Sequence, residues 1–130
     1  KARITAEQTR GGDATYAAGR VLDGRQDTYW ATDDSASSAT LELTWPQTQS
    51  FNIVCLREPV VLGQRIEKYR VDAWGDTGWI TLTSGTTIGN KKLDRFRRTH
   101  TTRLRIVLEK SRACPLLSEV GVYWDSKAGE

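Results

Sequence analysis

Short β-prone segments, separated by turn-forming residues, dominate the sequence, and almost nothing in it has the period of an amphipathic helix. The segments are ATLELTW (39–45), FNIVCLRE (51–58), IEKYRVDAW (66–74), WITLTSG (79–85), TRLRIVLEK (102–110) and EVGVYW (119–124). Gly, Pro, Asn, Asp and Ser lie between them, as expected of turns. Strands at this spacing, without helices between them, predict an all-β fold, an antiparallel sandwich or barrel. WGDTGW (74–79) predicts a hairpin, because Gly75 and Gly78 can supply positive φ angles.

Length and composition favour one globular domain. The 130 residues are 38% apolar and 27% charged, which allows a real hydrophobic core. No apolar run is long enough to span a membrane. The first residues, KARITAEQTRGG, lack the apolar segment of a signal peptide, so we expect a mature or excised piece.

Charge and motifs argue against two function classes. The 19 basic and 16 acidic residues leave a net charge of +3, and the one dense basic cluster, RFRR (95–98), is more typical of a solvated turn than of a nucleic-acid site. The sequence has no GxSxG, HExxH, CxxC or glycine-rich phosphate loop. His100 is the only histidine and has no evident nucleophile beside it, while Asp33 and Asp34 are adjacent carboxylates whose side chains diverge. We therefore expect a binding module rather than an enzyme.

The stretch RVLDGRQDTYWATDD (20–34) contains an Asp-Gly turn with several oxygen donors nearby. Gly24 lets the chain fold back after Asp23, and Thr28 adds a hydroxyl and a carbonyl. Oxygen donors from one compact loop suit Ca²⁺, although such a turn is also common without a metal. The residues alone leave both interpretations open.

The sequence resembles a known family over nearly its whole length, from Ala2 to Tyr123. The DG(x)₃TxW block, here DGRQDTYW, and the SEVGVY block are its most specific parts. They resemble discoidin domains, the coagulation factor V/VIII type C family, whose sugar-binding members form carbohydrate-binding module family 32. TYWATDD, LGQR, SGTTIG and RACP are similar to the C-terminal modules of bacterial family 29 α-L-fucosidases. The resemblance implies a single domain over residues 1–130, excised from a larger enzyme, with a galactose-binding-domain-like jelly-roll sandwich of about eight strands.

The resemblance also implies a structural Ca²⁺ that ties the first loop to the last strand. The implied ligands are the side chains of Asp23 and Glu119, the hydroxyl and carbonyl of Thr28, and the carbonyls of Arg20, Arg25 and Ser118. Asp27 is then better interpreted as a turn-capping residue than as a ligand.

Sugar binding in this family uses loops at one end of the sandwich. The sequence departs from the family pattern there, because Ala31 replaces a histidine common in galactose-binding relatives and RACPLL replaces a late-loop aromatic residue. The polar residues at matching positions are Thr32, Asp33, Asp34, Arg57, Glu58, Gln64, Arg65 and Arg112. From these we predict a sugar-binding rim, meaning the set Asp33, Arg57, Glu58, Arg65 and Arg112.

The resemblance supports one function and leaves alternatives. The rim is expected to bind terminal fucose or galactose of a glycan, so that a monomeric, non-catalytic module targets an attached glycoside hydrolase in a secreted, periplasmic or cell-surface protein. Alternatively, the same charged residues dock the module onto the catalytic domain of the parent chain without binding sugar. A third alternative is lipid binding, for which Val60, Val61 and Leu62 form the nearest exposed spike, but a single spike makes a membrane partner the least favoured.

The tryptophans and cysteines bear on the core and on the rigidity of the rim. Trp30 and Trp79 match core positions of the family, and Trp45, Trp74 and Trp124 give no clear sugar platform. Cys55 and Cys114 allow one intramolecular disulfide, which would rigidify the rim. Two free thiols are slightly favoured, because a disulfide needs a particular distance and orientation of the two cysteines and the sequence shows neither.

Overall fold

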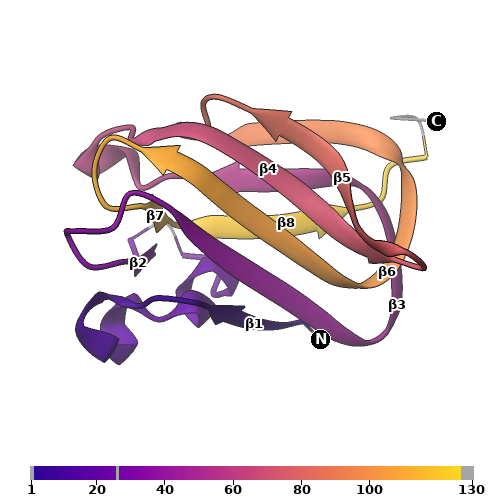
Figure 1. Cartoon of the computed structure of the whole chain (residues 1–130), viewed down its shortest axis with the longest axis horizontal. Coiled ribbons are helices and arrows are strands. Elements are labelled where there is room, and N and C mark those ends of the chain that lie inside the picture. Colours follow the sequence, from indigo (N-terminus) through magenta and orange to yellow (C-terminus); the bar gives the residue numbers. More distant parts are fainter. Residues whose placement is uncertain (1, 26, 127–130) are drawn as a thin grey trace.

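The computed structural model describes residues 2–25 and 27–126, which form eight strands and four short 3₁₀ helices (Figure 1). In chain order these are β1 (Arg3–Ala6), η1 (Arg10–Gly12), η2 (Ala14–Tyr16), η3 (Ala18–Leu22), β2 (Trp30–Ala31), β3 (Ala39–Arg57), η4 (Val60–Leu62), β4 (Ile66–Gly75), β5 (Gly78–Gly85), β6 (Lys92–Ser111), β7 (Leu116–Leu117) and β8 (Glu119–Tyr123). In this described part, no helix is long and apolar enough to cross a membrane.

All strand pairs are antiparallel. The main sheet has the order β1-β3-β6-β4-β5, β8 pairs with β3, and β2 and β7 form a separate two-stranded sheet. The long strands β3 and β6 bend, and the β3–β6 register shifts between Thr44 and Gln49 (Figure 1). The first half of β3 pairs with β1 and the second half of β6, whereas its second half pairs with β8 and the first half of β6. Strands that change layers at a bend close a sandwich at its corner, and the predicted all-β antiparallel fold is confirmed.

The core consists of alternate residues of the long strands. Leu41 and Leu43 of β3 and Leu104 and Ile106 of β6 are almost completely buried, because successive residues of a strand face opposite sides. Trp30 is also fully buried, and its indole N–H donates to the carbonyl of Gln8 at 2.9 Å. The predicted core position of Trp30 is therefore confirmed.

Trp79 is not a core residue, and that prediction was wrong. Ala73 faces the core, so the alternation of the strand turns Trp74 and its cross-strand partner Trp79 outward. The two rings meet edge to face with centroids 5.2 Å apart. The guanidinium groups of Arg103 and Arg105 lie 4.9 and 4.4 Å from the centre of the Trp79 ring and cover it.

The predicted hairpin at WGDTGW is confirmed as the turn between β4 and β5, where Gly75 pairs with Gly78. Only Gly78 has a positive φ angle, 119°. A Cβ atom at Gly75 would lie 2.8 Å from Cδ1 of Ile80, so the end of that exposed side chain would have to shift.

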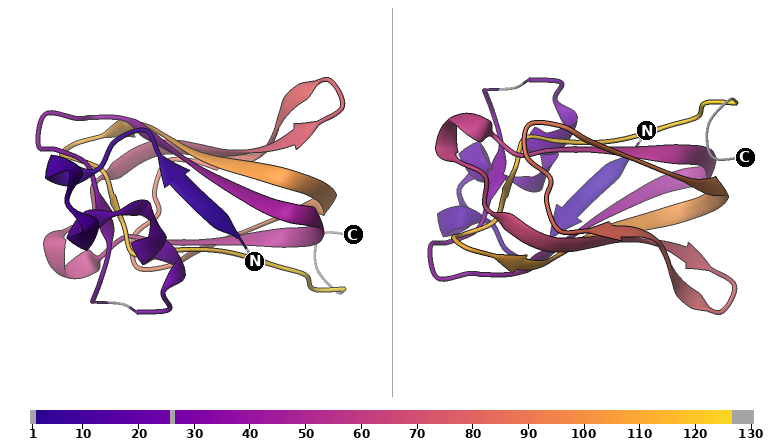
Figure 2. Two further views of the ribbon diagram at one scale, coloured as in Figure 1. Left: turned by 90° about the horizontal axis from the view of Figure 1, so that it is seen from below. Right: turned by 90° about the horizontal axis from the view of Figure 1, so that it is seen from above.

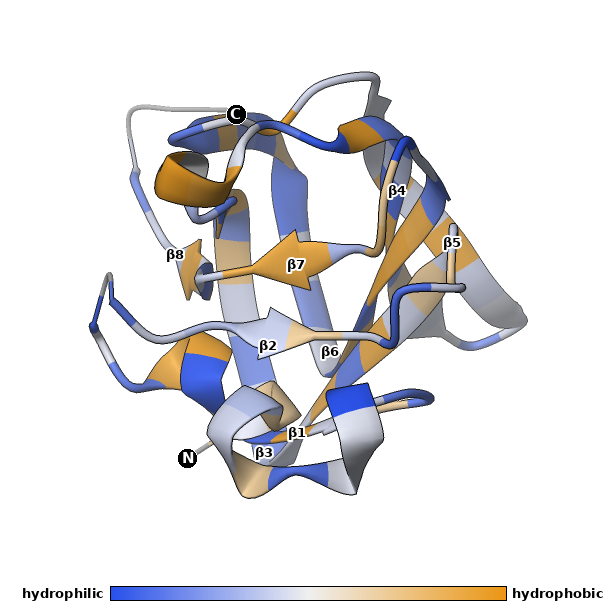
Figure 3. Ribbon diagram, turned by 90° about the vertical axis from the view of Figure 1, so that its left-hand side faces the viewer, coloured by the Kyte–Doolittle hydropathy of each residue, from blue (hydrophilic) through white to orange (hydrophobic). Residues whose placement is uncertain are grey.

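The 3₁₀ helices and the β2–β7 pair gather at one end of the sandwich, opposite the β4–β5 hairpin. We call these the loop end and the hairpin end. Figure 2 shows the separation from two sides, and Figure 3 looks onto the loop end. Segments far apart in the sequence meet at the loop end, because β2 pairs with β7. β2 follows the Asp-Gly turn, and β7 directly precedes β8.

Candidate functional site

The Asp-Gly turn follows η3 and is held by its own hydrogen bonds. Gly24 has a φ of 72°, which favours glycine. The backbone N–H of Arg25 donates to Oδ1 of Asp23 at 2.9 Å, and the hydroxyl of Thr28 donates to Oδ2. Burial alone would raise the pKa of the Asp23 carboxyl, but the hydrogen bonds from Thr28 and Arg25 and the nearby arginine charges lower it. The carboxylate is therefore kept ionised.

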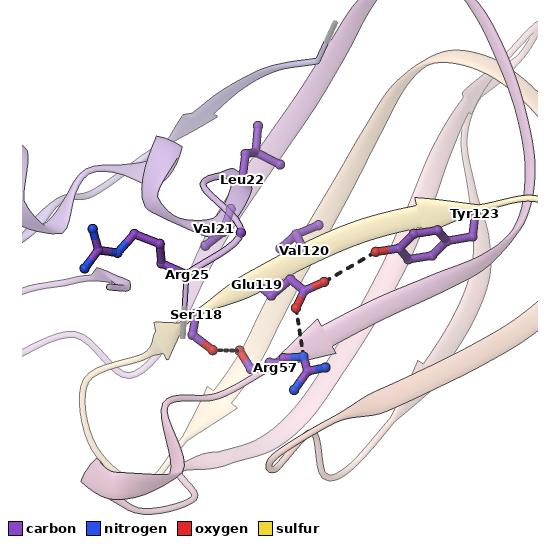
Figure 4. Close-up of a pocket in the computed structure, with 9 residues that line it drawn as sticks. Val21, Leu22, Arg25, Arg57, Ser118, Glu119, Val120 and Tyr123 are labelled. Atoms are coloured by element: carbon purple, nitrogen blue, oxygen red, sulfur yellow. Dashed lines mark hydrogen bonds and ion pairs between the residues drawn. The ribbon is translucent and has the colours of Figure 1, made fainter. Parts of the chain in front are cut away.

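A pocket of about 410 Å³ separates this turn from the start of β8 (Figure 4). Gly24 and Arg25 line one side, and Ser118 and Glu119 line the other. Oε1 of Glu119 lies 2.8 Å from Nε of Arg57, and the Tyr123 hydroxyl donates to Oε2 of Glu119 at 3.4 Å. The fold thus brings the two halves of the predicted calcium site, the turn and the Ser-Glu pair, to facing walls of one pocket.

The donor chemistry of these walls fits a hard cation. The predicted set contains two carboxylates, Asp23 and Glu119, with a hydroxyl and backbone carbonyls, all oxygen ligands of the kind that Ca²⁺ accepts. No three His, Cys, Asp or Glu side chains among the described residues are grouped for a metal, so carbonyl ligands would be essential. Of the other predicted ligands, Arg20 donates from Nε to the carbonyl of Ala14, and its own carbonyl belongs to η3.

Asp27 is engaged within the turn. Its carboxylate accepts from Nε and Nη2 of Arg25 at 2.9 and 2.7 Å, a two-pronged ion pair. This pairing agrees with the interpretation of Asp27 as a residue that stabilises the turn.

A second group of polar residues at the loop end surrounds the sulfur of Cys114. Arg10 donates from Nη2 to Oδ1 of Asp34 at 2.6 Å and to Sγ of Cys114 at 2.9 Å. Arg65 donates from Nη1 to the same sulfur at 3.1 Å and to the Cys114 carbonyl at 3.2 Å. The hydrogen bond and charge of Arg10 lower the pKa of the Asp34 carboxyl. We call Arg10, Asp34, Arg65 and Cys114 the Cys114 cluster.

Three residues of the predicted rim lie at or beside this cluster. Oδ1 of Asp33 accepts from the backbone N–H of Gly11 at 2.8 Å, next to Arg10. Arg65 belongs to the cluster, and the backbone N–H of Arg112 donates to the carbonyl of Arg65 at 3.0 Å. The Arg112 side chain is 66% exposed, with Glu67 at 3.8 Å as its ion-pair partner, so it remains accessible.

The structure does not bring Arg57 and Glu58 to that rim, which corrects the predicted set. Arg57 points into the pocket beside the Asp-Gly turn and pairs with Glu119 (Figure 4). Glu58 is buried, and its carboxylate accepts from the backbone N–H groups of Arg65, Ile66 and Gly89 at 2.7, 3.2 and 2.8 Å. Adjacent residues at the end of a strand point in different directions, so Arg57 and Glu58 lie in different places. Each makes structural contacts there, away from the rim.

Sequence reasoning missed an aromatic pair beside the Cys114 cluster. The rings of Tyr16 and Tyr29 are half-buried, with centroids 5.6 Å apart, and pack against Ala31 and Cys114. The alternation around Trp30 is the signal that could have found Tyr29: if Trp30 faces the core, then Tyr29 and Ala31 face the other side. Tyr16 lies in a 3₁₀ helix without a readable period, so only the fold places it there.

The two cysteines are free and buried, in different surroundings. Cys55 lies in β3 opposite Gly121 of β8, and burial, helped by the charge of Glu119, raises the pKa of its thiol. Cys114 contacts the two arginines described above. The structure therefore has the free thiols, not the disulfide. Of the predicted apolar spike, Val61 and Leu62 are exposed, while the side chain of Val60 lies outside the described part.

Comparison with known proteins assigns the fold to a family. The model of the F5/8 type C domain matches residues 3–120. The chain belongs to the F5/8 type C domain family. This confirms the resemblance to discoidin domains noted from the DG(x)₃TxW and SEVGVY blocks.

The relatives of this F5/8 type C domain include fucosidases. It is 35% identical over 133 residues to alpha-L-fucosidase 1 of Arabidopsis thaliana. The match covers 99% of this chain and 26% of that protein. A GH29 fucosidase of Ruminococcus gnavus, solved in complex with fucose, is 34% identical with a TM-score of 0.88 over 97% of the chain and 26% of that structure. The domain spans about a quarter of the length of its curated relatives, as expected of an accessory module.

A carbohydrate-binding structure shares the fold at lower identity. The chitosan-binding module 2 from a chitosanase/glucanase of Paenibacillus sp. IK-5, solved in complex with chitotriose, superimposes with a TM-score of 0.80 at 22% identity. The match covers 93% of this chain and 95% of that one, so the two share the whole domain fold.

Proposed function

We propose that this F5/8 type C domain binds a terminal sugar of a glycan, fucose or galactose, at the Cys114 cluster and thereby holds an attached glycoside hydrolase at its substrate. The observation that carries the proposal is that Cys114 is shared by two groups: the Tyr16 and Tyr29 rings pack against its apolar cluster, and Arg10 and Arg65 donate to its sulfur. A sugar offers an apolar face to an aromatic ring and hydroxyls to charged donors and acceptors.

The contacts of the two arginines with the sulfur can be exchanged at little cost. Both guanidinium groups donate to the sulfur of Cys114, and sulfur is a weak acceptor. Sugar hydroxyls are stronger acceptors, and the carboxylates of Asp33 and Asp34 can accept hydrogen bonds from them. A charged donor therefore gains when a hydroxyl replaces the thiol.

The relatives support a saccharide as the ligand class. The Ruminococcus gnavus fucosidase was solved with fucose and the Paenibacillus module with chitotriose. A module that meets glycans works where glycans are displayed, so we place it in a secreted, periplasmic or cell-surface protein. With two half-buried rings and no open aromatic platform in the cluster, affinity is expected to be weak, with a Kd on the order of 1 mM, or about 4 kcal/mol.

We also propose that the pocket between the Asp-Gly turn and β8 holds a structural Ca²⁺. Its ligands would be the side chains of Asp23 and Glu119, the hydroxyl and carbonyl of Thr28, and the carbonyls of Arg20, Arg25 and Ser118. The facing walls of the pocket support this, since both carboxylates belong to segments that meet there. The ion would supply a cross-link between the first loop and the last strand.

Calorimetric titration of the domain with methyl fucoside and methyl galactoside tests the sugar proposal. Arg10→Gln, Arg65→Gln and Arg112→Ala should each weaken binding, by about threefold to tenfold for the loss of a hydrogen bond. Lys110→Gln, which removes an exposed charge with only a distant ion-pair partner, serves as the control and should bind normally. Absence of sugar binding, with the domain tightly packed on a catalytic partner, would favour the docking function instead.

A further inference from the structure

The basic cluster RFRR (95–98) is not explained by the loop end, because it lies in the first half of β6. Arg95 pairs with Ile53 and Thr99 with Phe51, so three residues of β6 stand opposite Asn52 alone. Such a bulge breaks the alternation of a strand and redirects its side chains. As a result Arg97 and Arg98, although adjacent, are both exposed.

These two arginines line a groove at the hairpin end. The groove has a volume of about 410 Å³, in the range of roughly 300–1,000 Å³ typical of small-molecule sites. Trp74 and Ile80 line it as well, and they are 40% and 52% exposed. Phe96 also contributes to the groove and contacts Phe51 edge to face, which anchors the bulge to the core.

Two polar side chains of the groove, Arg98 and His100, contact other residues. The guanidinium group of Arg98 lies 4.6 Å from the centre of the Trp124 ring, and Nδ1 of His100 lies 2.6 Å from the hydroxyl oxygen of Ser50. Arg95, Arg97 and Arg98 form no ion pair with any carboxylate of residues 2–25 and 27–126. This differs from the outer face of the same sheet, where Arg103 and Arg105 are each paired with a carboxylate.

We propose that this groove is a second binding site, specific for an anionic saccharide that carries carboxylate or sulfate groups. The guanidinium groups of Arg97 and Arg98 supply charge-assisted donors for the anion, and Ile80 and Phe96 supply an apolar wall for the sugar ring. The site lies at the opposite end of the sandwich from the Cys114 cluster, so both can be occupied together (Figure 1). It would let one module contact a charged and a neutral part of the same glycan.

The test is titration with three probes of equal length: an oligogalacturonate, a sulfated oligogalactan and a neutral oligogalactan. Binding of at least one anionic probe, with little binding of the neutral one, is expected, and added salt should weaken it. The two anionic arms distinguish carboxylate from sulfate. Saturating methyl fucoside should not displace the anionic probe, which separates this site from the loop end whether or not that end binds sugar.

Charge-removal variants locate the site. Arg97→Gln and Arg98→Gln should each weaken binding of the anionic probe by about tenfold, the effect of losing a charge-assisted hydrogen bond. Arg95→Gln is the matched control, because it removes the same charge from the same strand outside the groove lining. The variants alter exposed side chains, and circular dichroism checks their folding. The proposal is overturned if neither anionic probe binds, if the neutral probe binds equally well, or if Arg95→Gln weakens binding as much as the other two.

Discussion

At the scale of single residues, Glu58 shows how burial changes the role of a charged side chain. Its carboxylate is buried and accepts hydrogen bonds from the backbone N–H groups of Arg65, Ile66 and Gly89. A carboxylate with two acceptor oxygens can satisfy all three N–H groups, whereas a glutamine offers one oxygen. The residue is therefore a structural clasp between the segments before β4 and β6.

Glu58→Gln should lower the free energy of unfolding by about 1–3 kcal/mol, because a buried N–H group loses its acceptor. Urea denaturation measures this change. Glu67→Gln, which alters a partly exposed carboxylate with only long ion pairs, should have an effect near zero. Equal stability of the Glu58→Gln variant and the parent would show that the clasp contributes nothing.

At the scale of elements, Asp72 connects β4 to its two neighbours. Its Oδ2 accepts from Arg70 at 3.0 Å and from Arg105 of β6 at 2.7 Å, and Oδ1 accepts from the Thr81 hydroxyl of β5 at 2.8 Å. Burial would raise the pKa of this carboxyl, but the hydrogen bonds from Arg105, Thr81 and Arg70 lower it. The ionised form is therefore bound more tightly in the folded state than in the unfolded state.

A lowered pKa in the folded state stabilises the protein above the unfolded value of about 3.9, and this contribution is lost as the pH falls through the folded pKa. Stability should therefore decline as the pH drops below about 4. The Asp72→Asn variant should be less stable at neutral pH, and its stability should decline less steeply as the pH falls. Melting curves across this pH range measure it, with Asp76→Asn at the hairpin as control. An unchanged acid slope in Asp72→Asn would contradict the assignment.

Elements were predictable where hydrophobic alternation is regular. The segments 66–74 and 79–85 correspond to β4 and β5, and 119–124 to β8, whereas the segments 39–45 and 51–58 are two halves of one bent strand. The first half of β6 was missed because its bulge at Arg97 breaks the alternation. The outward position of Trp79 was missed because the arginines that partly cover its ring lie far along the chain, and no local pattern shows that they meet it.

The candidate site was predictable in part for the same physical reasons. Turn chemistry and the two family blocks located the Asp-Gly turn and Glu119, which the fold does bring to one pocket. The Cys114 cluster depends on contacts between Arg10 and residues far along the chain, and no local pattern encodes such contacts. Likewise, the directions of Arg57 and Glu58 depend on where β3 ends and β8 begins, and the sequence alone does not show these boundaries.

At the scale of the whole molecule, the proposed Ca²⁺ would join the first loop to the last strand. A ligand that binds only the folded state raises stability with its concentration. Calcium should therefore raise the Tm of the domain, and Asp23→Ala or Glu119→Ala should abolish that rise. Asp27→Ala is the control within the same turn, since Asp27 pairs with Arg25 and is not an expected ligand. A Tm that is the same with calcium and with chelator, in protein shown to be metal-loaded at the start, would refute the metal proposal.

Mapping of backbone amide shifts in the labelled domain, during titration with methyl fucoside and methyl galactoside, tests sugar binding at the loop end. We expect saturable shifts around Tyr29, Asp34, Arg65 and Cys114 for at least one sugar, while the amide signals of the β4–β5 hairpin do not shift. Shifts confined to the hairpin end, or none at sugar concentrations well above the expected millimolar Kd, would contradict it.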